Sequence, residues 1–435
     1  MQLSHEGFDR PGGVAGRVGL LRPLRNRDFR LLWAGMSVSL VGDGVFLVAT
    51  TWTAYSLWNT PAALAIVGIA LTVPTMACLL VGGAVSDRHD RRLVMVLADL
   101  GRFLAVAVLS GLALAHALTF PALVAAVAAY ALGAGFFTPA FEAVVPELVP
   151  DDELPQANAL DQFVRPTALR LLGPALGGVL VGLLGAGTAF AVDAASFGAC
   201  AAVIAAMEPR SAAAPEAVST SAAVLDGLRF VRRHVWLWGT LASAAIAYLL
   251  FLGPTEVLLP YLVKNNLHGS PADLGIVLAC GGVGAIAAAA WMGQRRQPKH
   301  PITAIYACWA LATLAVAGYA LGRTVPQLML ACLLFNALEA AGTIVWATLK
   351  QRHVPAELLG RVSSLDWLVS ISLLPVSYAL TAPVAAAAGA RMTLLVAGVA
   401  GAAVTLTALF LPGMRDLEKR DDLTAADGAS TSPSA

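Results

Sequence analysis

Twelve long apolar runs follow one another along the chain, separated by short polar segments. Each run has about the 20 residues that a helix needs to cross the hydrocarbon of a bilayer. The runs are continuously apolar rather than alternating, which excludes a transmembrane barrel and favours helices that satisfy their own backbone. The pattern therefore predicts an all-α polytopic membrane protein. The predicted spans are 31–57, 63–85, 93–115, 121–143, 167–186, 188–207, 236–261, 272–293, 302–321, 326–348, 364–386 and 391–412.

Composition supports this fold class. The 435 residues are 58% hydrophobic and only 13% charged, more apolar surface than a soluble protein of this length can bury. The net charge is +1 and the basic residues are scattered, which argues against a nucleic-acid partner. The five cysteines all lie inside apolar runs without metal-ligand spacing, so we interpret them as buried thiols and expect no metal site.

The connections between spans predict the orientation. With the amino terminus in the cytoplasm, 24 of the 28 Lys and Arg residues fall on the cytoplasmic side and three on the outer side. Basic residues favour cytoplasmic loops, so we expect both termini in the cytoplasm. The richness in Arg, Ala and Gly indicates a high-GC bacterial source, and hence the bacterial inner membrane.

A long connection divides the spans into two sets of six. It covers 208–235, beginning with an Ala/Ser/Pro linker and ending in a predicted amphipathic helix at the membrane surface. The predicted parts are a basic arm (1–30), an amino-terminal half (31–207), this linker, a carboxy-terminal half (236–412) and a disordered tail (413–435).

The two halves also repeat at an offset of 205 residues. Thr138 matches Thr343, and Leu160-Asp161 matches Leu365-Asp366. The matches surround a Pro-containing loop in each half, which indicates an internal duplication. Two six-helix halves in a parallel repeat are the architecture of one large transporter class.

The polar loop after the second span carries a motif that resembles the signature of the major facilitator superfamily between helices 2 and 3. Its residues are Gly83, Asp87, Arg88, Arg91 and Arg92. Asp90 departs from the pattern, since many members have a second Gly there. The resemblance implies a cytoplasmic gate, in which these arginines pair with Asp161 or with acids of the other half. The alternative is that the arginines only anchor the topology.

A second motif lies in the fifth span. Gly173-Pro174-Ala175-Leu176-Gly177-Gly178 resembles the motif of antiporter-type exporters. With Gly42-Asp43-Gly44 and the segments 136–141 and 145–150, it makes the chain similar to the drug-efflux branch that includes macrolide and siderophore exporters. The stripe of small residues predicts a close helix contact that seals one face, or ordinary close packing. Residues 130–137 lack the Arg of other drug/proton antiporters.

Ionisable residues inside spans cost about 2.5–3.5 kcal/mol each and mark functional candidates. Asp43 is the first, because Ser39, Asp43 and Thr50 lie on one polar face of the first span. It binds a proton or a cationic substrate in one interpretation and is a structural carboxylate in the other. The further acidic candidates are Glu142, Asp193, Glu256 and Glu339.

Other charged and aromatic residues have more structural interpretations. Asp99 and Arg102 are three residues apart and should pair on one helix face. We expect Asp161, Arg165 and Arg170 in a charge network between the halves, at the entry of the fifth span. Among aromatic residues, Phe137 and Trp346 are the selected cavity candidates, although packing or interfacial roles are the common alternatives.

The sequence contains no P-loop, no Ser/His/Asp pattern and no HExxH motif, so we expect neither an enzyme nor a cofactor. The favoured function is a monomeric secondary transporter that exports small amphiphilic molecules by proton antiport and alternating access. The alternatives are an importer or uniporter of a small metabolite, and a non-transporting membrane sensor or assembly partner.

Overall fold

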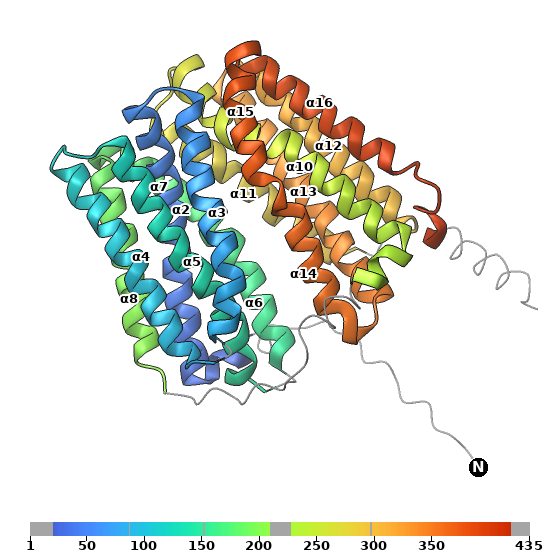
Figure 1. The fold of residues 1–435 in the computed structure, drawn as a ribbon, viewed down its shortest axis with the longest axis horizontal. Coiled ribbons are helices and arrows are strands. Elements are labelled where there is room, and N and C mark those ends of the chain that lie inside the picture. Colours follow the sequence, from blue (N-terminus) through green and yellow to red (C-terminus); the bar gives the residue numbers. More distant parts are fainter. Residues whose placement is uncertain (1–20, 87, 151–152, 209–227, 296–297, 419–435) are drawn as a thin grey trace, which may run out of the picture.

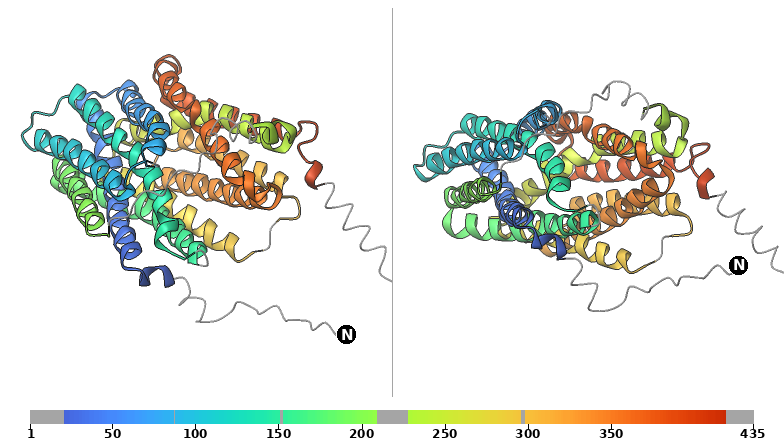
Figure 2. Two further views of the ribbon diagram at one scale, coloured as in Figure 1. Left: turned by 60° about the horizontal axis from the view of Figure 1, so that its bottom comes forward. Right: turned by 90° about the horizontal axis from the view of Figure 1, so that it is seen from below.

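The structure is a computed structural model that describes residues 21–86, 88–150, 153–208, 228–295 and 298–418. These residues form helices and no strands, and twelve helical segments are long and apolar enough to cross a membrane. Figure 1 shows the helices in two groups that lie side by side, one from each half of the chain. The two groups stay distinct in both views of Figure 2. The predicted all-α fold with twelve spans is therefore confirmed.

The amino-terminal half begins with a short 3₁₀ helix and contains the first six spans. Its elements are η1 (Arg22–Arg25), α2 (Arg27–Leu57), α3 (Pro61–Ser86), α4 (Arg91–Leu114), α5 (Phe120–Leu148), α6 (Leu154–Pro166), η3 (Thr167–Leu172), α7 (Gly173–Leu184) and α8 (Ala186–Ala205). The fifth span runs through α6, the π-helical η3 and α7.

The carboxy-terminal half supplies the other six spans. Its elements are α10 (Val235–Tyr261), η4 (Leu262–Asn266), α11 (Pro271–Gly293), α12 (Pro301–Leu321), α13 (Val325–His353), α14 (Ala356–Ser372), α15 (Leu374–Ala388) and α16 (Ala390–Ala408). The eleventh span runs through α14 and α15. We call the end of the bundle where α2 begins the basic end, and the end where α2 finishes the far end.

Several spans extend beyond their predicted limits at the basic end. Helices α5 and α13 continue to Leu148 and His353, because polar residues that leave the hydrocarbon still continue a helix. The tail also begins later than predicted. Met414 is fully buried, and Glu418 accepts hydrogen bonds from the Thr303 backbone nitrogen (2.7 Å) and hydroxyl (2.9 Å).

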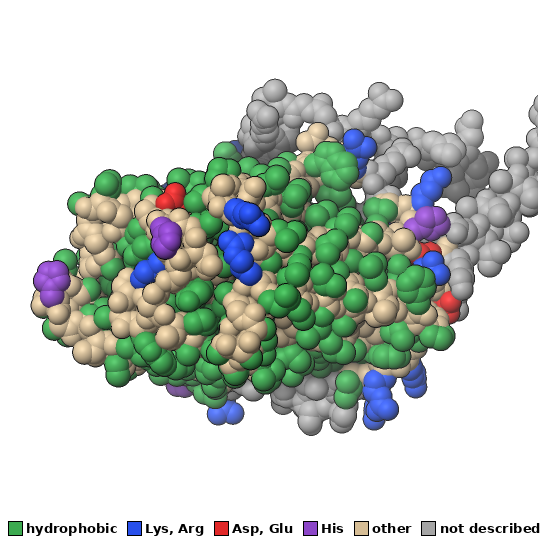
Figure 3. Space-filling model, turned by 90° about the horizontal axis from the view of Figure 1, so that it is seen from above, with side chains coloured by type: hydrophobic (Ala, Val, Ile, Leu, Met, Phe, Trp, Pro, Cys, Tyr) green, Lys and Arg blue, Asp and Glu red, His purple; other side chains and the backbone are tan. Residues whose placement is uncertain are grey.

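The outer surface of the helices is apolar, as a bilayer requires. Figure 3 shows a face dominated by hydrophobic side chains, with only scattered charged groups. On α4, large apolar side chains recur every three or four residues and are all exposed: Leu93, Leu97, Leu100, Leu104 and Val108. A helix that presents such a stripe outward is adapted to lipid rather than water.

The two halves repeat each other in local geometry. Helices α5 and α13 both have 29 residues, and both follow a Thr at the N-cap, Thr119 and Thr324. The turn between α7 and α8 contains Gly185 at φ 83°, and the turn between α15 and α16 contains Gly389 at φ 82°. Only glycine adopts this conformation readily, so both halves use the same residue for the same tight turn.

Candidate functional site

A charged core occupies the interior of the amino-terminal half, where α2, α4, α5 and α8 meet. Its members are Asp43, Asp99, Arg102, Tyr130 and Asp193. The side chains of Asp99, Arg102 and Asp193 are buried, with 0%, 4% and 0% of each residue exposed. Asp43 is only half-buried and is the most accessible carboxyl group of the three.

Arg102 is the cation at the centre of this charged core. Its guanidinium forms an ion pair with Asp99, one turn earlier on α4, as the sequence predicts. The guanidinium carbon lies 4.6 Å from the centroid of the Phe137 ring and 4.4 Å from that of Phe197. Gly133 leaves room for the side chain, since a Cβ there would lie 2.6 Å from Cγ of Arg102. Two aromatic faces and a carboxylate therefore hold this cation.

Asp43 is joined to the charged core through Tyr130. The Tyr130 hydroxyl donates a 2.5 Å hydrogen bond to Oδ1 of Asp43. Behind it, Ser196 donates to the backbone oxygen of Asp193 (2.7 Å), and the Asp193 Oδ2 atom has no hydrogen-bond partner among the described residues. Three carboxyl groups thus share one guanidinium in a site surrounded by lipid-facing helices. The interior of this half therefore contains more acidic than basic side chains.

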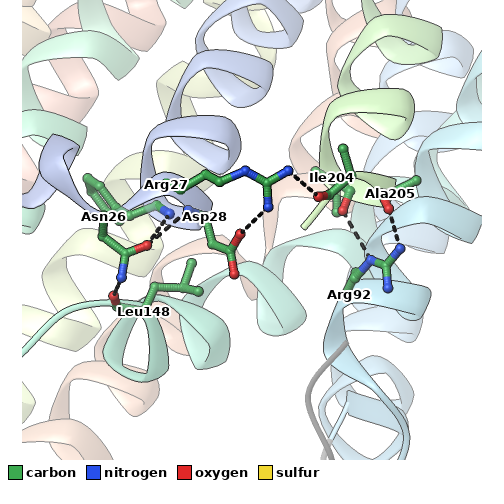
Figure 4. Close-up of polar contacts among 9 residues, drawn as sticks. Asn26, Arg27, Asp28, Arg92, Leu148, Ile204 and Ala205 are labelled. Carbon is green, nitrogen blue, oxygen red and sulfur yellow. Dashed lines mark hydrogen bonds and ion pairs between the residues drawn. The ribbon is translucent and has the colours of Figure 1, made fainter. Parts of the chain in front are cut away.

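The loop motif at the basic end joins helix ends within its own half. Figure 4 shows Arg92 donating to carbonyl oxygens at the end of α8, on Ile204 (3.2 Å) and Ala205. Arg27 donates to Ala206 in the same helix end, at 3.3 Å. Helix carboxy termini lack backbone partners and attract cations, so both arginines stabilise this end of α8.

Arg91 acts in the same way on α5, through the Ala143 oxygen (2.8 Å) and Glu147 (2.5 Å). The expected pairing with Asp161 does not occur in this arrangement, because Asp161 pairs with Arg165 at 3.1 Å. Gly83 lies in the last turn of α3, and Arg88 is exposed in the loop itself. Asp87 lies outside the described residues.

Asp90, which departs from the family pattern, is the N-cap of α4. Its side chain accepts a 2.9 Å hydrogen bond from the backbone nitrogen of Arg92. Asp is one of the preferred N-cap residues, so the acid at this position has a local structural reason. In the sequence, Asp90 precedes the apolar run of α4 by only two arginines, so it stands where a helix start is expected.

The two halves pack most extensively where α7 and η3 meet α11 and where α3 meets α15, and α2 and α10 add hydrogen bonds at the far end. Tyr55 donates to the Val257 backbone oxygen at 2.5 Å, and Lys264 donates to the Ser56 hydroxyl at 3.1 Å. Beyond them, Asn59 donates to the side-chain oxygen of Asn265 at 2.6 Å. These hydrogen bonds and the surrounding rings close the far end.

The glycine motif of the fifth span makes two different contacts. Gly173 packs against Gly44 of α2 in its own half. Gly178 packs against α11 of the other half, where an added Cβ would lie 2.8 Å from the Pro271 oxygen and 3.0 Å from the Gly275 Cα. The missing side chains let these backbones cross closely. Gly177 faces Val45 of α2.

The residues before Pro174 form the π-helix η3. Proline lacks the backbone N–H that would continue the helical pattern, and π-helical segments commonly mark functional sites. Arg170 projects from η3, and its Nη1 lies 4.0 Å from Oε2 of Glu339 on α13. This contact crosses between the halves, as predicted for Arg170. Asp161 and Arg165, for which the same network was predicted, pair with each other within α6.

A pocket lies inside the carboxy-terminal half, where α10, α12, α13 and α16 meet. Six of its lining residues have aromatic or polar side chains that a ligand could contact: Tyr248, Phe251, Trp309, Thr313, Phe335 and Glu339. The rings meet edge to face, with centroids 5.6 Å apart for Tyr248 and Phe251 and 5.9 Å apart for Phe251 and Phe335. We call this space the aromatic pocket.

The structure places both candidate cavity aromatics in packed positions within their own halves. Phe137 is buried under Arg102, and Trp346 is buried against Trp236 with its indole donating to Asp366 at 2.8 Å. Each ring packs within its own half beside a charged group. Phe137 offers its face to Arg102, and Trp346 donates its indole N–H to Asp366.

The remaining acidic candidates separate by exposure. Asp193 is fully buried in the charged core, whereas Glu142 and Glu256 are exposed. Glu142 lies near the basic end of α5, within electrostatic range of Arg165. Glu256 on α10 is within electrostatic range of Arg170. The structure therefore brings Asp43 and Asp193 together and leaves the other acids apart from them.

Sequence reasoning missed two polar partners. Tyr130 holds Asp43, although it is a lone Tyr in an apolar run. Asp366 on α14 pairs with Lys350 of α13, at the repeat position of Asp161. The offset between halves was the signal for Asp366, while no local pattern distinguishes Tyr130.

Comparison with known proteins gives a consistent assignment. The family model described as transmembrane secretion effector matches residues 18–428. The multidrug efflux pump Tap of Mycolicibacterium fortuitum is 27% identical over 402 residues, covering 89% of this chain and 96% of Tap. Macrolide efflux protein A of Streptococcus pyogenes is 22% identical over 403 residues, covering 90% of this chain and 97% of that protein.

Solved structures of low sequence identity share the fold. A bacterial homolog to the human lysosomal transporter Spinster superposes with a TM-score of 0.68 at 13% identity, covering 93% of this chain and 98% of its own. A bacterial homologue of the iron transporter ferroportin superposes with a TM-score of 0.65 at 18% identity, covering 88% of this chain and 98% of its own. The family and these relatives are transporters rather than enzymes. The chain is thus a membrane protein of the major facilitator superfamily and belongs to its transmembrane secretion effector family of efflux transporters.

Proposed function

We propose that the protein exports small amphiphilic molecules in exchange for protons, by alternating access across a bacterial inner membrane. The observation that carries this proposal is the charged core, with three carboxyl groups around the single guanidinium of Arg102. The excess of acid gives the core a reason to bind protons. Asp43 is its accessible member and the proposed site of proton entry.

The geometry supports a cycle of two states. The far-end hydrogen bonds and the Gly178 crossing hold the halves together at that end. Alternating access requires these contacts to break while the basic end closes. In that second state, the loop arginines and Asp161 are the proposed gate partners. We place the basic end and both termini in the cytoplasm because Lys and Arg gather there.

Efflux by the relatives supports the direction of transport and the amphiphilic substrate class. Tap and macrolide efflux protein A carry these activities in their names. The aromatic side chains of the aromatic pocket, of which Tyr248, Trp309 and Phe335 are half-buried, suit ligands with large apolar parts.

The test is transport by the purified protein in vesicles with an imposed pH gradient. Vesicles that are acidic inside should accumulate a drug from a panel while releasing protons, with the membrane potential clamped. Protein-free vesicles and an ionophore that collapses the gradient are the controls. If no compound moves in response to the gradient, proton antiport is wrong.

A further inference from the structure

The aromatic pocket corresponds to the charged core through the internal repeat. At the offset of 205 residues, Asp43 corresponds to Tyr248, and Phe46 corresponds to Phe251. Tyr130 corresponds to Phe335 in the same way. Four equivalent helices therefore enclose both spaces: α2, α4, α5 and α8 in one half, and α10, α12, α13 and α16 in the other.

The position of Arg102 is occupied by an aromatic ring in the carboxy-terminal half. The buried residues of α4 recur in α12 at a constant spacing, so Met95 aligns with Ile302 and Leu109 with Val316. The same alignment places Trp309 opposite Arg102. The charged core thus contains its own cation between two rings, whereas the aromatic pocket has rings and no Lys or Arg in its lining.

Glu339 gives the aromatic pocket its only carboxylate. It lines the pocket from α13, and its Oε1 accepts a 3.1 Å hydrogen bond from Thr343. Its side chain is 25% exposed, so a ligand can reach it. Aromatic faces attract cations, and a carboxylate in a low-dielectric site attracts them further. A cationic ligand would give Glu339 a counter-ion from within the pocket, which a neutral ligand would not.

Arg170 provides the competitor. Its guanidinium belongs to the other half, approaches Glu339 at 4.0 Å and has a side chain that is 51% exposed. A distance of 4.0 Å is long for an ion pair, so Arg170 holds Glu339 loosely. A cation bound in the aromatic pocket replaces Arg170 and removes one contact between the halves.

We propose that the aromatic pocket binds an organic cation with aromatic substituents, and that Glu339 exchanges Arg170 for this cation when it binds. The proposal deepens the proposed function, because it takes this cation as the exported substrate. Binding would then loosen the halves at η3, next to the glycine motif that packs across them.

Binding of tetraphenylphosphonium to the purified full-length protein in detergent tests the proposal. Calorimetry should give a Kd for the wild type that rises at least about tenfold in Glu339→Gln, the change expected for losing one strong charge interaction. Glu208→Gln removes an exposed acid outside the pocket and should bind like the wild type. Wild-type affinity in Glu339→Gln would overturn the proposal.

A neutral probe and a second variant protect this test from misfolding. Triphenylphosphine oxide has similar rings without the charge, and Glu339→Gln should bind it as the wild type does. Arg170→Gln removes the competitor and should bind tetraphenylphosphonium several-fold more tightly. If Glu339→Gln binds neither probe, the affinity of Arg170→Gln for tetraphenylphosphonium becomes the deciding measurement. An affinity equal to or weaker than that of the wild type would also overturn the proposal.

No proton gradient enters these measurements, so the two proposals fail separately. If the cation binds through Glu339 but no transport follows the gradient, the proposal for the pocket stands and proton antiport is rejected. Gradient-driven transport with unaltered binding in Glu339→Gln would reject the pocket and leave proton antiport intact.

Discussion

The two halves share one scaffold but fill it differently. In the amino-terminal half, Arg102 is enclosed by Phe137, Phe197 and Asp99, so the charge is neutralised by the protein itself. In the carboxy-terminal half, the equivalent space is lined by rings and opens to Glu339. A duplicated bundle can thus neutralise a buried charge in one copy and leave the equivalent space of the other open, and our two proposals rest on this difference.

The largest expected effect comes from removing the cation of the charged core. Arg102→Gln leaves buried Asp99 without its partner and should destabilise the protein by about 3–5 kcal/mol. Thermal unfolding in detergent measures this change. Arg323→Gln, at an exposed arginine near the far end, should unfold like the wild type. Equal melting temperatures for the two variants would mean that Arg102 does not compensate the buried acids.

The contact between the halves gives the next effect. Gly178→Ala places a Cβ 2.8 Å from the Pro271 oxygen, and such overpacking costs about 1–3 kcal/mol. If far-end closure is required, the transport rate should fall about tenfold. Gly182→Ala is the matched control, since no atom lies within 4 Å of its added Cβ. Similar rates in both variants would contradict a sealing role for Gly178.

The smallest expected effect concerns one hydrogen bond at the far end. Tyr55→Phe removes the donor to the Val257 oxygen but keeps the ring packed against Tyr261, with centroids 5.7 Å apart. The far-end closed state should lose about 1 kcal/mol. Distance measurements between spin labels on the far ends of α2 and α10 report this population. A population unchanged from that of the wild type would show that the closed end does not depend on this bond.

Much of the fold followed from the sequence because lipid restricts the possible structures. Continuous apolar runs in a bilayer form helices, so the twelve spans and their order were predictable. The Asp99–Arg102 pair was predictable as well, since residues three apart share a helix face. The extensions of α5 and α13 were not, because polar helix ends look like loops in a hydrophobicity pattern.

The sites were less predictable because they depend on contacts between distant helices. Asp43 was recognisable as an intramembrane acid, but its partner Tyr130 is 87 residues away. Phe137 looked like a cavity residue because it is an aromatic side chain on a helix expected to line the cavity. Its actual neighbour, Arg102, comes from another helix. The aromatic pocket is lined by four helices that lie far apart in the sequence, so no local pattern predicts it.

The most direct test of the division between the halves is Asp43→Asn in vesicles. The variant should retain the exchange of labelled tetraphenylphosphonium at equal pH on both sides, because the aromatic pocket is unchanged. Under an inward-acidic pH gradient it should accumulate none of the compound, since the accessible carboxyl group of the charged core is gone. Undiminished gradient-driven accumulation by Asp43→Asn would contradict the assignment of proton binding to the amino-terminal half.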